Sequence, residues 1–175
     1  PEVNITGYRN TELRVRKLNL KDMLINKTVL DIGSNTGAIL FNLKDIIKFG
    51  VGIEINHFLV KISNKIKRYL NCKNVSFVEN SFENYESFLK FDVILSLANH
   101  KTFDGNTKQN LSQYFRKIHS LINTNGKLIF ESHPPEIETD QQFKEVLKNI
   151  KLFFEIVEKP EIKMKGFLDK NRKYL

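Results

Sequence analysis

The 175-residue chain has a single cysteine, Cys72, only four prolines and no long apolar run. One cysteine excludes an internal disulfide framework and any zinc site built from several thiolates. No stretch approaches the roughly 20 apolar residues that cross a bilayer, so we expect no membrane-spanning helix. No internal repeat or Gly/Ser/Pro-rich linker divides the chain. We therefore expect one globular domain in a reducing cytoplasm. Because the sequence begins at Pro1 rather than methionine, we also expect a fragment of a longer chain.

Positive charge is in excess, with 28 Lys and Arg against 20 Asp and Glu, a formal net charge of +8. Such an excess can favour nucleic acid, phosphorylated substrates or anionic surfaces. Abundant Lys, Asn, Ile and Phe are also typical of proteins from AT-rich genomes, and no motif of aromatic residues and arginine accompanies the charge. Nucleic-acid binding is therefore an alternative that the sequence does not favour.

Apolar strand-like runs alternate with amphipathic helical segments through most of the chain. We predict strands at 29–32, 51–55, 75–78, 91–95, 127–130 and 152–158. We predict helices at 11–24, 38–48, 58–70, 107–121 and 139–149. Strands that alternate with helices and are apolar on both faces predict an α/β fold with a doubly wound, mostly parallel sheet.

The first two predicted strands each end in a carboxylate. The first lies in VLDIGSNTGA (29–38) and the second in VGIEIN (51–56). Glycine at 33 and 37 allows close backbone approach, and Asn35 tolerates left-handed geometry. Glu54 at the tip of the second strand is placed to accept hydrogen bonds from ribose hydroxyls. A dinucleotide-binding fingerprint is a poor fit, because Asn35 and Ala38 stand at its second and third glycine positions when counted from Gly33.

Read as D-x-G-x-N-x-G, the first stretch resembles the first motif of the class I S-adenosylmethionine-dependent methyltransferases. The resemblance covers about residues 8–158 and implies a Rossmann-like sandwich with S-adenosyl-L-methionine as methyl donor. It implies a methyltransferase domain at 29–175 preceded by a lid segment at 1–28. In that family a seventh strand runs antiparallel between the fifth and sixth, and residues 172–175 would begin such a strand before the chain stops.

The resemblance also implies which residues bind the cofactor, nearly all of them at the carboxyl ends of strands. Asp31 would organise the first loop, Glu54 would bind the ribose, and Ser81 would accept a hydrogen bond from the adenine amine where many family members carry an acidic residue. Arg9 or Arg14 would close over the methionine carboxylate. The full set is Asp31, Gly33, Ser34, Asn35, Gly37, Glu54, Ile55, Ser81, Phe82, Ser96, Leu97, Arg9 and Arg14.

Four polar residues follow the fourth and fifth strands and should face the acceptor. Asn99 and His100 follow the fourth strand, and Glu131 and His133 follow the fifth. We predict that His100 is a general base, because imidazole titrates near neutral pH and can take a proton from an attacking hydroxyl. A metal site at Glu131, His133 and His100 is an alternative that we do not favour, since their spacing matches no metal-binding motif. Hydrogen bonding to a polar acceptor is the role we predict for the other three.

The reaction implied by the resemblance is methyl transfer, and we predict an oxygen of a small polar acceptor as its target. Asn99-His100 and His133-Pro134-Pro135 are similar to segments of small bacterial methyltransferases that act on sugar or capsule precursors, and the lysine excess suits a phosphorylated acceptor. Two alternatives remain: an RNA methyltransferase, and a non-catalytic methyltransferase-like partner subunit. Intact Gly33, Gly37 and Glu54 argue against the second. The sequence carries no signal for an oligomeric state.

Overall fold

A computed structural model describes residues 10–101, 108–134, 136–157 and 175. Five strands form one sheet in this part of the chain: β1 (Thr28–Ile32), β2 (Phe49–Glu54), β3 (Val75–Glu79), β4 (Phe91–Leu97) and β5 (Ile122–Glu131). Their order is β3-β2-β1-β4-β5, and every neighbouring pair runs parallel. The predicted α/β fold with a doubly wound parallel sheet is confirmed.

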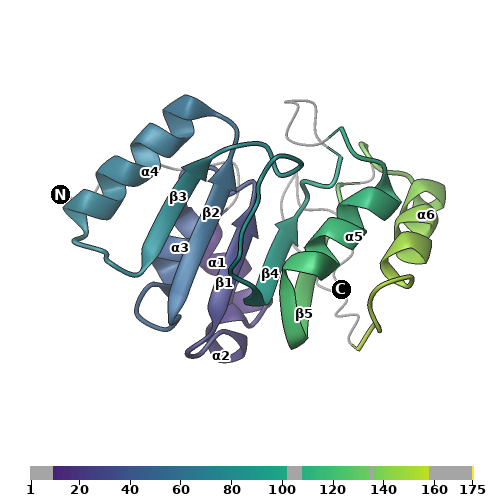
Figure 1. The fold of residues 1–175 in the computed structure, drawn as a ribbon, viewed down its shortest axis with the longest axis horizontal. Helices are drawn as coiled ribbons and strands as arrows, with labels where there is room; N and C mark the ends of the chain where they lie inside the picture. Colours follow the sequence, from purple (N-terminus) through teal and green to yellow (C-terminus); the bar gives the residue numbers. More distant parts are fainter. Residues whose placement is uncertain (1–9, 102–107, 135, 158–174) are drawn as a thin grey trace.

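Helices cover both faces of the sheet. One face carries α1 (Thr11–Lys17), α2 (Leu20–Met23) and α3 (Ala38–Leu43), and α4 (His57–Tyr69) packs along β3 and β2. The other face carries α5 (Leu111–Leu121) and α6 (Asp140–Ile150). Figure 1 shows α5 in front of the sheet and α1 and α3 behind it. No helix among the described residues has the length and apolarity needed to cross a membrane.

The two layers arise from the alternation of side chains along the central strands. Val29 of β1 joins the apolar cluster formed with α1 to α3, whereas its neighbour Leu30 joins the cluster formed with α5 and α6. Successive residues of a strand point to opposite faces, so a continuous apolar run buries itself on both sides. This is why apolar residues of β1 and β4 are buried on both faces of the sheet.

The order of the strands defines where a ligand can bind. β1 pairs with β2 on one side and with β4 on the other, so the chain winds outward from β1 in two directions. The crevice beyond the carboxyl ends of β1 and β4 is a topological switch point, which is where open α/β sheets bind their ligands. The loop after β1 and the chain after β4 therefore form the walls of the candidate site.

The single helix predicted at 11–24 is wrong, because the chain forms two helices there. Asn19 has φ of 48° in the left-handed region, and this residue separates α1 from α2. Leu20 and Leu24 are nevertheless fully buried, so the apolar spacing continues across the break. Helical periodicity alone could not show that the backbone turns between the two segments.

Two other helices are shorter than predicted. The helix predicted at 38–48 ends at Leu43, and the helix predicted from 107 begins at Leu111. Asn110 caps α5 by accepting a hydrogen bond from the backbone N–H of Gln113, whose side chain accepts in return from the N–H of Asn110. This capping box supplies partners for otherwise unpaired N–H groups, and it defines the start of α5.

The sixth strand predicted at 152–158 is also wrong over its described residues. Residues 152–157 form a turn and irregular chain after α6, and residue 158 lies outside the described part. Phe153 and Phe154 lie against the ring of His119 on α5, with ring centroids 5.9 and 5.6 Å away. The apolar residues of this segment pack on a helix and do not extend the sheet.

Only Leu175 of the predicted seventh strand is described. Its N–H donates to the carbonyl oxygen of Phe130 at 2.9 Å, and its own carbonyl accepts from the N–H of Phe130 at 2.7 Å. Two residues exchange both bonds in this way when they face each other in antiparallel strands. Leu175 therefore lies along the outer edge of β5, and residues 172–174 lie outside the described part.

Asp92 joins three strands at the amino edge of the sheet. Its carboxylate accepts hydrogen bonds from the N–H and Oγ1 of Thr28, both at 2.8 Å, and from Nδ2 of Asn123 at 2.8 Å. The backbone hydrogen bond from Thr28 is the largest influence on the pKa of Asp92. It lowers that pKa together with the side chains of Asn123 and Thr28 and the charge of Lys27, against the opposing effect of burial.

We expect Asp92→Ala to lower the free energy of unfolding by about 2 kcal/mol, because three donors lose their acceptor. The folded-state pKa lies below the unfolded value, so the stabilisation is present above about pH 4 and is lost as pH falls through the folded pKa. Urea unfolding at neutral and acid pH measures both effects. Glu145→Ala, which removes only an exposed ion pair with Lys148, is the control. Equal destabilisation by the two variants would contradict the role of Asp92.

Candidate active site

The loop after β1 contains three residues with left-handed backbone. Gly33, Asn35 and Gly37 have φ of 68°, 52° and 76°. A Cβ on Gly37 would lie 2.3 Å from Cζ of Phe77, so both the conformation and the space require glycine there. The N–H of Ser34 donates to the carbonyl of Ile53 at 2.9 Å, which ties the loop to β2. The loop is therefore a tight turn with its backbone at the crevice.

Glu54 connects this loop to the end of β2. Its Oε2 accepts a hydrogen bond from the N–H of Asn35 and its Oε1 from the N–H of Asn56, both at 2.9 Å. The side chain is buried, with 6% of the residue exposed. A carboxylate can accept about four hydrogen bonds, so two backbone donors leave acceptor capacity on each oxygen. Glu54 therefore closes the turn, and each of its oxygens can accept a further hydrogen bond.

Asp31 is buried in the middle of the sheet, one residue before the end of β1. Burial raises the pKa of Asp31 to about 7; the positive charge of Arg14 opposes this shift and the negative charge of Glu54 adds to it. Desolvation disfavours the charged form of a carboxyl group. Asp31 is therefore a carboxyl group that changes its charge near neutral pH directly beneath the loop.

Arg14 extends from α1 to the carboxyl ends of β4 and β5. Its Nε donates to Oε2 of Glu131 at 2.8 Å, Nη2 donates to the same oxygen, and Nη2 also reaches the carbonyl of Leu97 at 3.4 Å. The carboxyl side chain of Glu131 is almost fully buried in this pair. The structure thus brings together Arg14, Glu131 and Leu97, all predicted site residues, while Arg9 lies outside the described residues.

The end of β4 is bonded to the end of β1 by a buried polar network. The side chains of Ser96, Asn99 and Tyr114 are mutually hydrogen-bonded at 2.9 Å, and Nδ2 of Asn99 donates to the carbonyl of Ile32. Burial raises the pKa of the Tyr114 hydroxyl above its usual range. Both the oxygen and the nitrogen of the Asn99 side-chain amide therefore have hydrogen-bond partners within the protein. The predicted contact of Asn99 with the acceptor stays a prediction.

The turn out of β4 places His100 in a second buried pair. Ala98 has φ of 59°, which is uncommon for a residue with a Cβ, and it precedes Asn99 and His100. Nε2 of His100 lies 2.7 Å from Oε1 of Glu138, and both side chains are almost fully buried. The other oxygen of Glu138 accepts from the backbone N–H of His133 at 3.2 Å. The rings of His100 and His133 lie 4.8 Å apart.

Glu138 is not among the residues predicted for the site from the sequence. Burial on its own would raise the pKa of Glu138, but the hydrogen bond and charge of His100, with the N–H and charge of His133, outweigh burial and lower that pKa. The only local signal was a carboxylate beside Thr139, the N-cap of α6. Its partner lies 38 residues away in sequence, so no spacing rule points to it.

The residues predicted to contact adenine follow β3 and β2. Ser81 begins a turn after β3, where its Oγ accepts from the N–H of Asn84 at 3.3 Å. Phe82 is fully buried, with its ring centroid 5.1 Å from that of Tyr114. Ile55 is half-buried between Glu54 and Asn56, and Asn56 caps α4. The predicted contacts of Ser81, Phe82 and Ile55 with adenine stay predictions.

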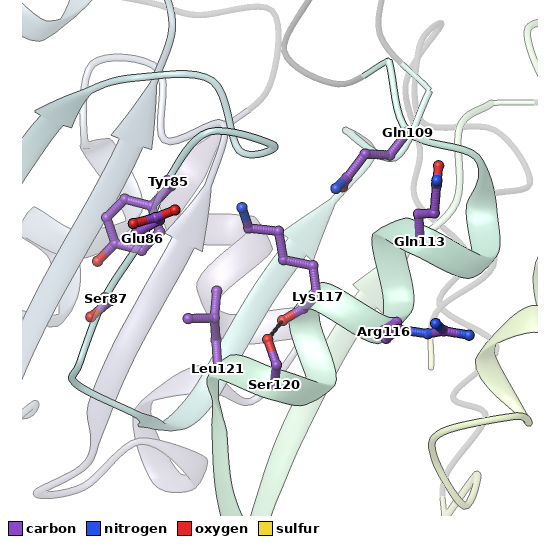
Figure 2. Close-up of a pocket in the computed structure, with 9 residues that line it drawn as sticks. All are labelled: Tyr85, Glu86, Ser87, Gln109, Gln113, Arg116, Lys117, Ser120 and Leu121. Atoms are coloured by element: carbon purple, nitrogen blue, oxygen red, sulfur yellow. Dashed lines mark hydrogen bonds between the residues drawn. The ribbon is translucent and has the colours of Figure 1, made fainter.

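A pocket of about 530 Å³ lies between residues 85–87 and α5, and Figure 2 shows the residues that line it. Nζ of Lys117, which lines it, donates to the carbonyl of Glu83 at 2.6 Å, and burial is the main cause of its lowered pKa. None of the lining residues belongs to the loop after β1 or was predicted as a site residue. Among the described residues no group of three or more His, Cys, Asp or Glu side chains is arranged to hold a metal ion.

Several solved structures are similar in fold to this chain. Trm5b from Pyrococcus abyssi is similar, with a TM-score of 0.69 and 15% identity over 95% of this chain and 48% of that one. The N-methyltransferase NodS from Bradyrhizobium japonicum WM9, in complex with S-adenosyl-L-homocysteine, has a TM-score of 0.73 and 14% identity over 93% and 83%. An rRNA methylase from Streptococcus thermophilus has a TM-score of 0.65 and 12% identity over 95% and 93%. The chain spans about half the length of Trm5b.

A family model described as a methyltransferase domain matches residues 25–172, and the chain belongs to this family. The predicted membership of the class I S-adenosylmethionine-dependent methyltransferases, with their Rossmann-like fold and cofactor, is confirmed. No curated protein matches the sequence.

Asp31 offers a test of the electrostatics of the site. Its folded-state pKa of about 7 exceeds its ordinary value of 3.8, so the folded state holds a proton that the unfolded state releases, and stability falls as pH rises between these values. We expect Asp31→Asn to be stabilised relative to the unmodified protein as pH rises through this range, by at most about 4 kcal/mol. Urea unfolding across the range measures the difference, with exposed Asp45→Asn as control. A difference that does not vary with pH would show that Asp31 is not perturbed.

Proposed function

We propose that this chain binds S-adenosyl-L-methionine across the carboxyl ends of β1 and β2 and transfers its methyl group to an oxygen of a small polar acceptor. The observation that carries the proposal is the Glu54 contact, which joins the glycine-containing loop to β2 and leaves acceptor capacity on each carboxylate oxygen. Family membership and the switch-point position support it. We assign the lid role to the segment at 1–28, from which α1 carries Arg14 over the crevice.

The residues at the crevice fit an adenosyl group. Oγ of Ser34 is buried and has no hydrogen-bond partner among the described residues. Buried polar atoms normally have such a partner, so we propose that a bound ligand supplies it. A Cβ on Gly52 would lie 2.6 Å from this oxygen, so glycine there leaves room for Ser34. Glu54 supplies acceptors suited to a ribose diol. Arg14 is paired with Glu131, and we propose that its guanidinium also interacts with the methionine carboxylate.

When bound, the cofactor supplies a methyl group that is already activated on a sulfonium. The residues of the chain then need to align the acceptor and remove its proton. We propose that His100 takes this proton as general base, because it follows the end of β4 and forms a buried pair with the carboxylate of Glu138. The hydrogen-bond network of Ser96, Asn99 and Tyr114 would hold the end of β4 beside β1. It would thereby fix the positions of Leu97 and His100.

The acceptor that we propose is a small polar molecule. A sugar, phosphorylated or capsule-precursor metabolite is our first choice, and a bacterial cytoplasm is our choice of location, since Cys72 is a free thiol. RNA is the second candidate, because the net charge of +8 favours anionic partners and one of the similar structures is named as an rRNA methylase. Steep salt dependence of RNA binding would favour the second candidate.

We expect Glu54→Ala to weaken the binding of S-adenosyl-L-homocysteine by about 1–3 kcal/mol, because a ribose diol and the N–H of Asn35 lose their acceptor. Isothermal titration calorimetry measures the affinity. Glu54→Gln keeps one carbonyl acceptor, so its affinity for S-adenosyl-L-homocysteine should lie between those of the unmodified protein and Glu54→Ala. Asp45→Ala, at the opposite edge of the sheet, and His100→Ala should bind the ligand with nearly unchanged affinity. Unchanged affinity in Glu54→Ala would show that the ribose is bound elsewhere.

A further inference from the structure

An exposed lysine precedes each of the four neighbouring strands β3, β2, β1 and β4. In that order across the sheet they are Lys73, Lys48, Lys27 and Lys90, each within two residues of the start of its strand. Parallel strands begin at the same edge of a sheet and lie about 5 Å apart, so these four residues form a lysine row along the amino edge. In Figure 1 this edge is at the bottom, where α2 is labelled, and the crevice is at the opposite edge.

Hydrogen bonds between neighbouring turns hold the lysine row in place. The N–H of Lys48 donates to the carbonyl of Lys27 at 2.9 Å, and the N–H of Gly50 donates to the carbonyl of Asn74 at 2.9 Å. The carboxylate of Asp92 accepts from the N–H of the first residue of β1 at 2.8 Å, which ties the start of β4 to the start of β1. The backbone positions of the row are therefore set by the sheet.

The positive charge of the lysine row is not cancelled by acidic neighbours. None of its four members forms an ion pair with an acidic residue that the structure describes. Lys27 lies near Asp92, but that carboxylate already accepts three hydrogen bonds. The other acidic residues in the segments before these strands each lie near a basic residue outside the row: Asp22, Asp45, Glu83 and Glu86. The amino edge thus presents an excess of positive charge to an anionic partner.

Large apolar side chains are exposed beside two of the four lysines. Phe88 and Leu89 directly precede Lys90, in a turn where the Ser87 hydroxyl accepts from the N–H of Leu89 and donates to the carbonyl of Leu89. Phe88 is fully exposed, and Leu89 is 61% exposed. Ile25, two residues before Lys27, is exposed to the same extent. The amino edge therefore combines lysines with apolar side chains that have no packing partner within the core.

An anionic membrane surface matches this combination. Apolar side chains enter the boundary between headgroups and acyl chains, while the long stems of neighbouring lysines keep their ammonium groups among anionic headgroups. Single-stranded nucleic acid favours arginine and aromatic side chains that stack on bases. The lysine row contains no arginine, and Ile25 and Leu89 are aliphatic. A second copy of the chain, related by a two-fold axis, would place the lysine row opposite itself, which like charges disfavour.

We propose that the amino edge of the sheet is a peripheral membrane-binding surface. The lysine row attracts anionic phospholipid headgroups, and Ile25, Phe88 and Leu89 insert among the upper parts of the acyl chains. Because the crevice lies at the opposite edge, the bound protein keeps its crevice open to the solution. The surface shares no residue with the proposed cofactor site, so the inference goes beyond the proposed function and does not depend on it.

Co-sedimentation with lipid vesicles tests the charged part of the surface. One set of vesicles contains equal parts of phosphatidylglycerol and phosphatidylcholine, and the other contains phosphatidylcholine alone. We expect the chain to bind the first set at low ionic strength, to bind the second set weakly, and to bind the first set less as added salt screens the lysines. Each lysine near an anionic membrane contributes ~fivefold to partitioning, so Lys27→Gln with Lys48→Gln should weaken binding ~20-fold.

A matched pair of substitutions separates the lysine row from net charge. Lys61→Gln with Lys65→Gln removes the same charge from exposed positions of α4 and should bind the anionic vesicles nearly as the unmodified protein does. Equal weakening by the two pairs, or no binding to anionic vesicles at all, would overturn the inference. Binding of a short single-stranded RNA that depends on Lys27 and Lys48, in place of vesicle binding, would overturn it as well.

Phe88→Ser tests the apolar part of the surface. We expect this variant to bind anionic vesicles ~tenfold more weakly, because one large apolar side chain no longer leaves water. Phe58→Ser is the control, since it removes an exposed phenylalanine from the start of α4, near the carboxyl edge. Equal binding by Phe88→Ser and the unmodified protein would show that apolar side chains of this edge do not insert, and would overturn the inference.

The two proposals fail in different measurements. The lysine-row and Phe88 variants should bind S-adenosyl-L-homocysteine with unchanged affinity in calorimetry, because these residues lie at the edge opposite the crevice. Failure of the unmodified protein to bind S-adenosyl-L-homocysteine would contradict the proposed function alone. Failure of the unmodified protein to bind anionic vesicles would contradict the membrane-binding surface alone.

Discussion

The site depends on one carboxylate that holds two backbone segments together. Glu54 accepts the N–H of Asn35 from the loop after β1 and the N–H of Asn56 from the start of the turn into α4. Without that carboxylate, the left-handed turn at Asn35 would lose its main tie to β2, since Ser34 would supply the only other hydrogen bond shown between them. If Glu54 also binds the ribose as we propose, the geometry of the loop and the binding of the cofactor depend on the same buried carboxylate.

The chain after β4 is held in place differently, because its polar groups are buried in pairs and networks away from solvent. Ser96, Asn99 and Tyr114 join β4 to the last carbonyl of β1, and His100 and Glu138 follow immediately beyond them. Each member of such a network is costly if left unsatisfied, so the network defines one arrangement of the chain after β4. The left-handed Ala98 belongs to this arrangement, because it turns the chain so that Asn99 reaches back to β1 and His100 faces α6.

Features determined by short-range pattern could be predicted, and features determined by distant contacts could not. The parallel sheet, the left-handed loop and the place of Glu54 follow from spacing within a few residues. Glu138 was missed because its partner His100 is 38 residues away, and the break at Asn19 was missed because apolar spacing continues across it. The segment at 152–157 shows the reverse error, since Phe153 and Phe154 look strand-like but pack against α5. The apolar residue types indicated that this segment packs against the rest of the protein. Its tertiary contacts with α5, and not its β-propensity, determine the backbone conformation.

The ion pair of Arg14 with Glu131 has a consequence for the order in which the molecule assembles. It joins residues 117 positions apart, and α1, with seven residues, is too short to be a stable helix on its own in water. The ion pair cannot form until β5 has been added beside β4, and closing so long a loop is unfavourable before those strands are in place. We therefore expect α1 to pack first on its neighbour α3, and the Arg14–Glu131 contact to form late in folding, once the sheet is complete.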